Sequence, residues 1–441
     1  MPTLDSGLRN ALDTTIGRAR DEAERAAARA LTTLAVNQAE PFPHLTEEER
    51  RLRNQLRAKA RQLGDRERLD ARESLTRAWA IVGECAYEHW HRMLFARFLA
   101  ENGLLIYPDA GVAVSLADCA QIAAELGIAD PWLLVAEYAA QMLPGIFRAD
   151  DPLLHVGLAA EGRQALERLL ESIPTAVFTS EDGLGWVYQF WQSRRKAEVN
   201  ANGAKIGGAD IAPVTQLFTE PYMVQFLLHN TLGAWWAARH PDDPLVAELT
   251  YLRRLDDGTP AAGTFDGWPS RAAEVTIMDP CCGSGHFLVA AFDLLRRMRE
   301  REEGLTPAEA CAATLRDNIH GLEIDARCTQ IAAFAMALAA WKAAGYQALP
   351  VPHVACSGIP VGGRLYEWTS IAKGDTILAE NLRQLYELFK DAPELGSLIG
   401  PSRETGIGLF ASDPAVVLRF LYRSAGENYM VSPDLLLSSG V

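Results

Sequence analysis

Several features that mark other classes of protein are missing from this sequence. The seven cysteines include no CxxC pair, and an odd number cannot all pair with one another, so we expect reduced thiols. Neither the cysteines nor the nine histidines show a zinc-ligand spacing, and we predict no metal site. The apolar stretch at residues 331–341 is too short to cross a bilayer, and no charged segment followed by an apolar one opens the chain. We therefore expect a cytoplasmic protein with no membrane partner.

Excess positive charge is also missing, because the formal net charge at pH 7 is -15. A protein that contacts nucleic acid over much of its surface would be basic. Composition therefore gives no support for a DNA substrate, although one local basic patch can suffice. The length of 441 residues and the hydrophobic content of 49% allow one large core or two to three domains.

The first part of the chain predicts helices, with a charged segment at residues 1–82 and a second helical region at 83–212. Thr46 and Glu49 have the spacing of a helix-capping box. An arginine-rich run follows from Arg50 to Arg68. Such a run either contacts phosphates or forms a solvated face, and we favour the solvated face because charge runs usually serve that purpose.

An aromatic stretch closes this helical region. Residues 185–191 read GWVYQFW, and the polar, glycine-containing residues 193–211 predict a helix end followed by a connector. Aromatic rings beside cations either stack on bases or anchor an interface between domains. We favour the interface.

From residue 215 the pattern changes to alternating strands and helices. We predict strands at residues 274–278, 318–324 and 351–356, and helices at 221–236, 287–299 and 325–343. This alternation is typical of a doubly wound, Rossmann-like α/β sheet. We assign residues 213–375 to this core and residues 376–441 to a helical segment with the end of the chain.

A glycine-rich turn follows the first predicted strand. Residues 279–287 read DPCCGSGHF and lead into a helix, the layout of a cofactor site at the carboxyl edge of a sheet. No lysine follows Gly285, which excludes a phosphate-binding Walker loop, and Leu288 replaces the third glycine of a dinucleotide fingerprint. Asp279 would repel a pyrophosphate but suits a ligand with an ammonium group and no phosphate. The sequence therefore predicts S-adenosylmethionine as cofactor, with a dehydrogenase that has a degenerate dinucleotide loop as the alternative.

The end of the second predicted strand supplies the other half of this site. Glu323 can accept hydrogen bonds from both ribose hydroxyls, and Ile324 would lie against the adenine. Glu323 could instead be a surface carboxylate or one that supports a neighbouring group without touching the ligand, but its place at a strand end favours the ribose role. We expect Asp325 to cap the next helix.

These residues resemble motifs of amino-methylating DNA methyltransferases. The sequence DPCCGSGHF resembles motif I, GLEID at residues 321–325 resembles motif II, and TQLFTEPYMV at 215–224 resembles motif X, with Glu220 as an extra residue before the proline. In that family motif X covers the methionine end of the cofactor. The resemblance and the pattern together predict cofactor contacts from Phe218, Thr219, Asp279, Pro280, Cys281, Gly283, Ser284, Gly285, Phe287, Glu323 and Ile324.

The resemblance is greatest to the PglX-type adenine methyltransferases of BREX phage-defence systems and to the related methylase of class I DISARM, and it covers roughly residues 85–400. It implies N6-methylation of adenine in duplex DNA after base flipping, within a phage-defence or restriction-modification system. The family's catalytic motif is [DNS]PP[YF], whose first side chain and first proline carbonyl accept hydrogen bonds from the adenine amino group.

That catalytic motif is absent from this chain, so we predict no catalytic residues. The segments that come nearest to it, at Asp413-Pro414 and Ser432-Pro433, each have a single proline and no aromatic residue. We expect either a truncated enzyme, or half of a split enzyme completed by a second polypeptide, or a cofactor-binding regulatory or assembly subunit of a defence complex. The expected partners are duplex DNA, the completing polypeptide and other defence-system subunits, and we expect the isolated chain to be inactive.

Overall fold

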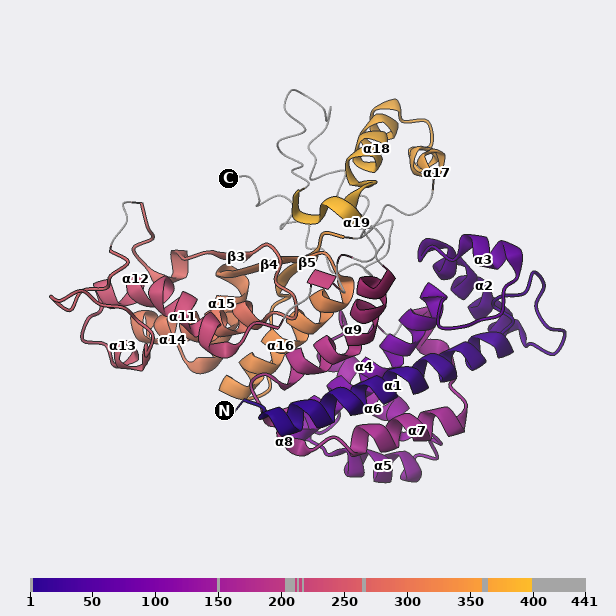
Figure 1. Ribbon diagram of the computed structural model, residues 1–441, viewed down its shortest axis with the longest axis horizontal. Helices are drawn as coiled ribbons and strands as arrows, with labels where there is room; N and C mark the ends of the chain where they lie inside the picture. Colours follow the sequence, from indigo (N-terminus) through magenta and orange to yellow (C-terminus); the bar gives the residue numbers. More distant parts are fainter. Residues whose placement is uncertain are drawn as a thin grey trace. The chain divides into compact units, whose positions relative to one another are not determined.

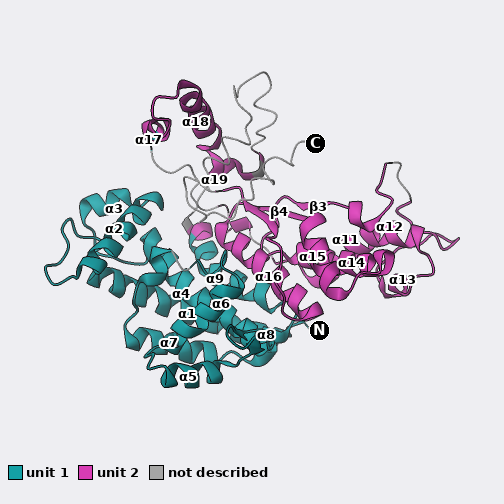
Figure 2. Cartoon of the chain, turned by 180° about the vertical axis from the view of Figure 1, so that it is seen from behind, with its two compact units in different colours: residues 1–198, 362–364 teal, residues 199–361, 365–441 magenta. Residues whose placement is uncertain are grey.

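The computed structural model describes residues 3–148, 151–202, 211, 214–215, 218–263, 267–358 and 364–398. The chain forms two compact units, shown in Figure 2. We call residues 1–198 with 362–364 the helical unit, and residues 199–361 with 365–441 the sheet-containing unit. The division predicted at residues 82, 212 and 375 stays a prediction, and the predicted features after residue 398 lie outside the described residues.

The helical unit confirms the expectation of a helical region at the start of the chain (Figure 1). Its one strand pair in the described ranges is the antiparallel hairpin of β1 (Ile106–Tyr107) and β2 (Val112–Ala113). Its helices are α1 (Ser6–Thr33), α2 (Glu47–Gln62), α3 (Arg66–Ala71), α4 (Ala80–Glu101), α5 (Leu116–Glu125), α6 (Pro131–Met142), η1 (Pro152–His155), α7 (Ala160–Glu171), α8 (Thr175–Thr179) and the greater part of α9 (Gly183–Asn202).

Helix α4 is apolar around most of its circumference, which is typical of a buried helix. It forms the centre of the helical unit and contacts α1, α2, α6, α7 and α8. Tyr188 and Trp191 of α9 pack on it, with Trp191 stacked on Trp90 at 6.4 Å between ring centroids. Trp191 and Tyr188 are each only 1% exposed, so these rings form core rather than a base-stacking surface. The expected connector from residue 193 was wrong as far as Asn202, because α9 continues to that residue.

The arginine-rich helix α2 begins with the predicted capping box, in which Thr46 and Glu49 exchange hydrogen bonds. Arg53 is buried and donates to the carbonyls of Ala35, Gln38 and Ala39. Arg57 donates to the carbonyls of Val36 and Gln38. These arginines therefore hold the turn after α1 by satisfying its backbone carbonyls, a structural role that neither sequence hypothesis anticipated.

In the sheet-containing unit, the segment predicted as one helix at residues 221–236 forms two. Helix α11 ends at Asn230, and Thr231 leaves helical geometry with φ -116° and ψ -86°. The described elements are α11 (Pro221–Asn230), α12 (Leu232–Arg239), α13 (Pro244–Glu248), η2 (Ala272–Glu274), β3 (Ile277–Asp279), α14 (His286–Glu303), α15 (Pro307–Asp317), β4 (Ile319–Glu323), α16 (Ala326–Ala344), β5 (His353–Cys356), α17 (Leu365–Ser370), α18 (Thr376–Phe389), α19 (Ala392–Leu395) and η3 (Gly396–Leu398).

The three predicted strands form one parallel sheet in the order β3-β4-β5, as Figure 1 shows. The first strand is shorter than predicted, because residues 272–274 form the turn η2. Helices α14, α15 and α16 pack on the sheet, and their apolar faces join α11 and α12 in one core that includes Trp236, Phe292 and Ile319. None of the helices among the described residues combines the length and the apolar character needed to cross a membrane.

A candidate cofactor site at the carboxyl edge of the sheet

The glycine loop connects β3 to α14 and turns through two glycines in the left-handed region. Gly283 has φ +53° and Gly285 has φ +82°, conformations that residues with a side chain rarely adopt. A Cβ at Gly285 would lie 2.9 Å from Cα of Ala332, so the loop also packs closely on α16. A Cβ at Gly283 would meet nothing within 4 Å, so this part of the loop faces open space.

Glu323, at the end of β4, binds the glycine loop directly. One carboxylate oxygen accepts from the Gly283 N–H at 2.7 Å, and the other accepts from Ile324 and Asp325 at 2.9 and 3.0 Å. The side chain is 8% exposed. Burial raises the pKa of this carboxyl, while the three N–H donors lower it. Glu323 therefore joins the two predicted halves of the site, and the sequence did not name Gly283 as its partner.

Asp279 ends β3 opposite Gly321 in the parallel ladder and therefore lies at the same edge of the sheet as Glu323. Its carboxylate accepts from the Cys281 N–H at 3.1 Å, and burial raises its pKa. No lysine or arginine occurs between residues 279 and 287. Two carboxylates beside a loop without lysine or arginine suit a ligand that carries positive charge.

The remaining predicted residues belong to this loop, follow it directly at the start of α14, or lie in the segment that resembles motif X. Phe218 lies edge-on to His286 at 4.5 Å between ring centroids, which brings this residue of the segment resembling motif X to the start of α14. Thr219 is partly exposed, as is Ser284, whereas Pro280 and Cys281 are exposed. Phe287 is partly buried and packs against the core of the unit. The structure thus places Phe218 at the loop, and cofactor contacts from all of the predicted residues stay predictions.

The chain after β4 follows the predicted pattern. Asp325 accepts from the Arg327 N–H at 2.9 Å and caps α16, as expected. Ile324 is partly buried, and its carbonyl accepts from the thiol of Cys356, the last residue of β5. No group of three or more His, Cys, Asp or Glu side chains that could hold a metal ion occurs within the described ranges.

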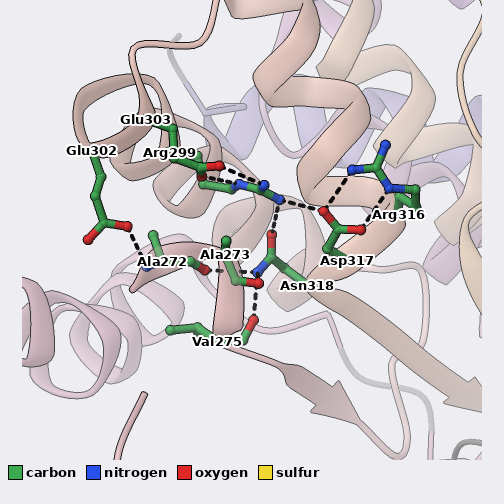
Figure 3. A network of polar contacts seen from close by, with 9 residues as sticks. All are labelled: Ala272, Ala273, Val275, Arg299, Glu302, Glu303, Arg316, Asp317 and Asn318. Carbon is green, nitrogen blue, oxygen red and sulfur yellow. Dashed lines mark hydrogen bonds and ion pairs between the residues drawn. The ribbon is translucent and has the colours of Figure 1, made fainter. Parts of the chain in front are cut away.

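A buried polar network fixes the opposite end of β3 and β4 (Figure 3). Asn318, fully buried just before β4, donates to the carbonyls of Ala272 and Val275 at 3.0 and 2.6 Å. Its side-chain amide oxygen Oδ1 accepts from Arg299, which also pairs with Asp317. This network sets where β3 begins and hence where the glycine loop starts. Asn318 was not singled out from the sequence. The available signal was a polar residue placed directly before an apolar strand.

Comparison with known proteins relates the glycine loop and the strands beside it to a DNA-methyltransferase family. Residues 262–349, which include β3 through α16, match the family described as MmeI, DNA-methyltransferase domain. The chain is 26% identical to the adenine-specific methyltransferase BrxX of Escherichia coli O9:H4 (strain HS) over 426 residues, which cover 82% of this chain and 34% of BrxX.

Two proteins called adenine-specific methyltransferase PglX are also similar. The protein of Lacticaseibacillus casei (strain Zhang) is 28% identical over 58% of this chain and 22% of its own length. The protein of Streptomyces coelicolor is 31% identical over 37% of this chain and 11% of its own length. The chain therefore spans about a third or less of these relatives. On these matches, the chain is a distant homologue of the PglX and BrxX adenine-specific methyltransferases, similar to part of their length.

Proposed function

We propose that this chain binds S-adenosylmethionine and forms the cofactor-binding part of an adenine-N6 DNA methyltransferase of a phage-defence or restriction-modification system. The observation that carries the proposal is the contact between Glu323 and Gly283, since it joins the glycine loop to the acidic end of the next strand. The order β3-β4-β5 supports a Rossmann-like class I methyltransferase core, in which ligands bind at the carboxyl edge.

The residues present fit this cofactor. Asp279 would hold the ammonium group, and Glu323 would accept the ribose hydroxyls with lone pairs that its backbone donors leave free. Ile324 would lie against the adenine, and Phe218 with Thr219 would cover the methionine end. The bound cofactor would supply the methyl group, and the protein's contribution is to hold it in one orientation for transfer.

The sequence contains no recognisable motif for the half of the site that would bind the substrate adenine. No two prolines are adjacent anywhere in the 441 residues, so the [DNS]PP[YF] motif is absent. We propose that the isolated chain does not methylate DNA and that a further polypeptide segment supplies the adenine site and the recognition of duplex DNA.

The edge of β3 supports completion by such a segment. The Ile277 N–H donates to Asn318, and alternation in a parallel ladder then directs the backbone groups of Met278 away from β4. Within the described ranges no strand pairs with this edge, and the Met278 side chain is 47% exposed. An exposed Met278 is unusual in a parallel sheet, because such sheets are normally buried on both faces.

Calorimetric titration with S-adenosylmethionine tests the cofactor proposal. We expect Asp279→Ala to weaken binding at least tenfold, which corresponds to about 1.4 kcal/mol. Asp293→Ala, on α14 and paired with Arg296, serves as the matched control and should bind like the unaltered chain. Equal affinities for Asp279→Ala and the unaltered chain would refute the proposed pocket.

Methyl transfer and gene context test the remaining proposals. Incubation with tritiated cofactor and varied duplexes should leave adenine unlabelled, and stoichiometric labelling would contradict the proposed inactivity. If the adenine site is supplied by a separate polypeptide, a neighbouring reading frame should contain an NPPY-type motif. A neighbourhood without such a frame would argue against a split enzyme.

A further inference from the structure

The chain that leaves β5 binds the backbone of the two residues proposed to hold the nucleoside. Glu323 and Cys356 are partners in the parallel ladder. Beyond that pair, the Ser357 N–H donates to the Glu323 carbonyl at 2.8 Å, and the Ser357 hydroxyl donates to the same oxygen at 3.3 Å. The Cys356 thiol donates to the Ile324 carbonyl at 3.5 Å. Both carbonyls are therefore held from the same short segment.

Gly358 brings this segment into close contact with Ile324. A Cβ at Gly358 would lie 2.1 Å from the Ile324 carbonyl oxygen and 2.6 Å from its Cγ1. Contacts this short do not occur for real Cβ atoms, and the obstructing atom is backbone rather than a flexible side-chain end. Because the φ of Gly358 is not in the left-handed region, glycine is required here for space alone.

The chemistry of Cys356 agrees with a donor and not with a nucleophile. Burial raises the pKa of the thiol to about 11, and the nearby carboxylates of Asp325 and Glu323 also raise it, while hydrogen bonds with Gly358 and Thr329 lower it. The thiol therefore stays protonated near neutral pH and keeps the proton that it donates to Ile324.

We propose that residues 356–358 are a positioning segment for the nucleoside half of the cofactor. By holding the carbonyls of Glu323 and Ile324, the segment fixes the backbone from which the ribose-binding carboxylate and the adenine-facing side chain project. Its residues act on the site through Glu323 and Ile324. The inference rests on the proposed function, because it assigns a role within the same site.

Calorimetry with two ligands tests the positioning role. S-adenosylmethionine contains both halves, whereas 5′-methylthioadenosine keeps the nucleoside and lacks the amino acid group. We expect Gly358→Ala to weaken both ligands at least tenfold, and Asp279→Ala to weaken S-adenosylmethionine alone. Gly157→Ala, where a Cβ would meet nothing within 4 Å, should leave both affinities unchanged.

The Cys356 variants keep the test decisive even if Gly358→Ala does not fold. Cys356→Ala removes the donor and should weaken both ligands three- to tenfold, while Cys356→Ser restores a donor and should return both affinities to within about twofold of the unaltered chain. If Gly358→Ala and Cys356→Ala both bind the two ligands like the unaltered chain, the positioning role is refuted while the proposed function stands. The same holds if these variants weaken S-adenosylmethionine but not 5′-methylthioadenosine. Failure of the unaltered chain to bind either ligand would instead refute the proposed function and the inference with it.

Discussion

Replacing Glu323 by glutamine changes one atom of the contact that joins the glycine loop to β4. The remaining oxygen can still accept from Ile324 and Asp325, but the new NH2 group would face the Gly283 N–H, donor against donor. A hydrogen bond to a charged group contributes about 1.5–3 kcal/mol, and the site is 8% exposed, so water cannot readily replace it. We expect the free energy of unfolding of the sheet-containing unit to fall by about 2–3 kcal/mol.

Thermal unfolding of the ligand-free chain measures this loss, with an expected decrease in Tm of roughly 5–10 °C for that unit. Hydrogen exchange should also become faster at Gly283. Glu309→Gln is the matched control, because Glu309 accepts from Thr306 in an exposed capping box, a position where glutamine serves as well as glutamate. If Glu323→Gln unfolds at the same temperature as Glu309→Gln, with exchange at Gly283 unchanged, the contact does not hold the loop.

Three further changes follow from the structure. Gly285→Ala should cost about 1–2 kcal/mol of backbone strain, as should Gly304→Ala at φ +69°, but only Gly285 adds a steric clash with α16. Chemical denaturation should therefore give a clearly lower free energy of unfolding for Gly285→Ala than for Gly304→Ala. Equal losses of stability in the two variants would disprove the close packing of Gly285 on α16. Arg53→Lys should destabilise the helical unit by about 2 kcal/mol, because lysine cannot replace the guanidinium fork on three carbonyls, whereas Arg51→Lys on the exposed face should change stability by less than about 0.5 kcal/mol. Indistinguishable midpoints for these two variants would remove the structural role of Arg53. Burial raises the pKa of Glu88 from 4.5 to about 7, so the native state holds this proton more tightly and the free energy of unfolding should fall as pH rises through that window. Glu88→Gln should flatten the stability profile between these pH values, and an unaltered profile would show that another group titrates there.

Sequence patterns predicted the features that depend on neighbouring residues. The capping box at Thr46, the three parallel strands, the glycine loop and the cap at Asp325 all follow from residues within a few positions of one another. Such features are set by local backbone geometry, which short motifs encode directly. The same patterns indicated that Asp279 and Glu323 would meet at one edge of a sheet, because parallel strands bring their carboxyl ends together.

Tertiary structure decided which partner each of these residues takes. The sequence placed Glu323 at a strand end, but only folding shows that its carboxylate binds Gly283, 40 positions away. The sequence left two hypotheses for the arginines of α2 and two for the aromatic rings of α9. In the structure, Arg53 of α2 binds backbone carbonyls, and Trp191 of α9 packs in the core around α4. Burial and long-range hydrogen bonding depend on the whole fold, because the same polar or aromatic side chain is stable in water or in a complementary interior. The sequence by itself therefore determined a glycine loop with Asp279 and Glu323 at the neighbouring strand ends, and the fold determined that Glu323 binds this loop and that residues 356–358 bind the backbone of Glu323 and Ile324.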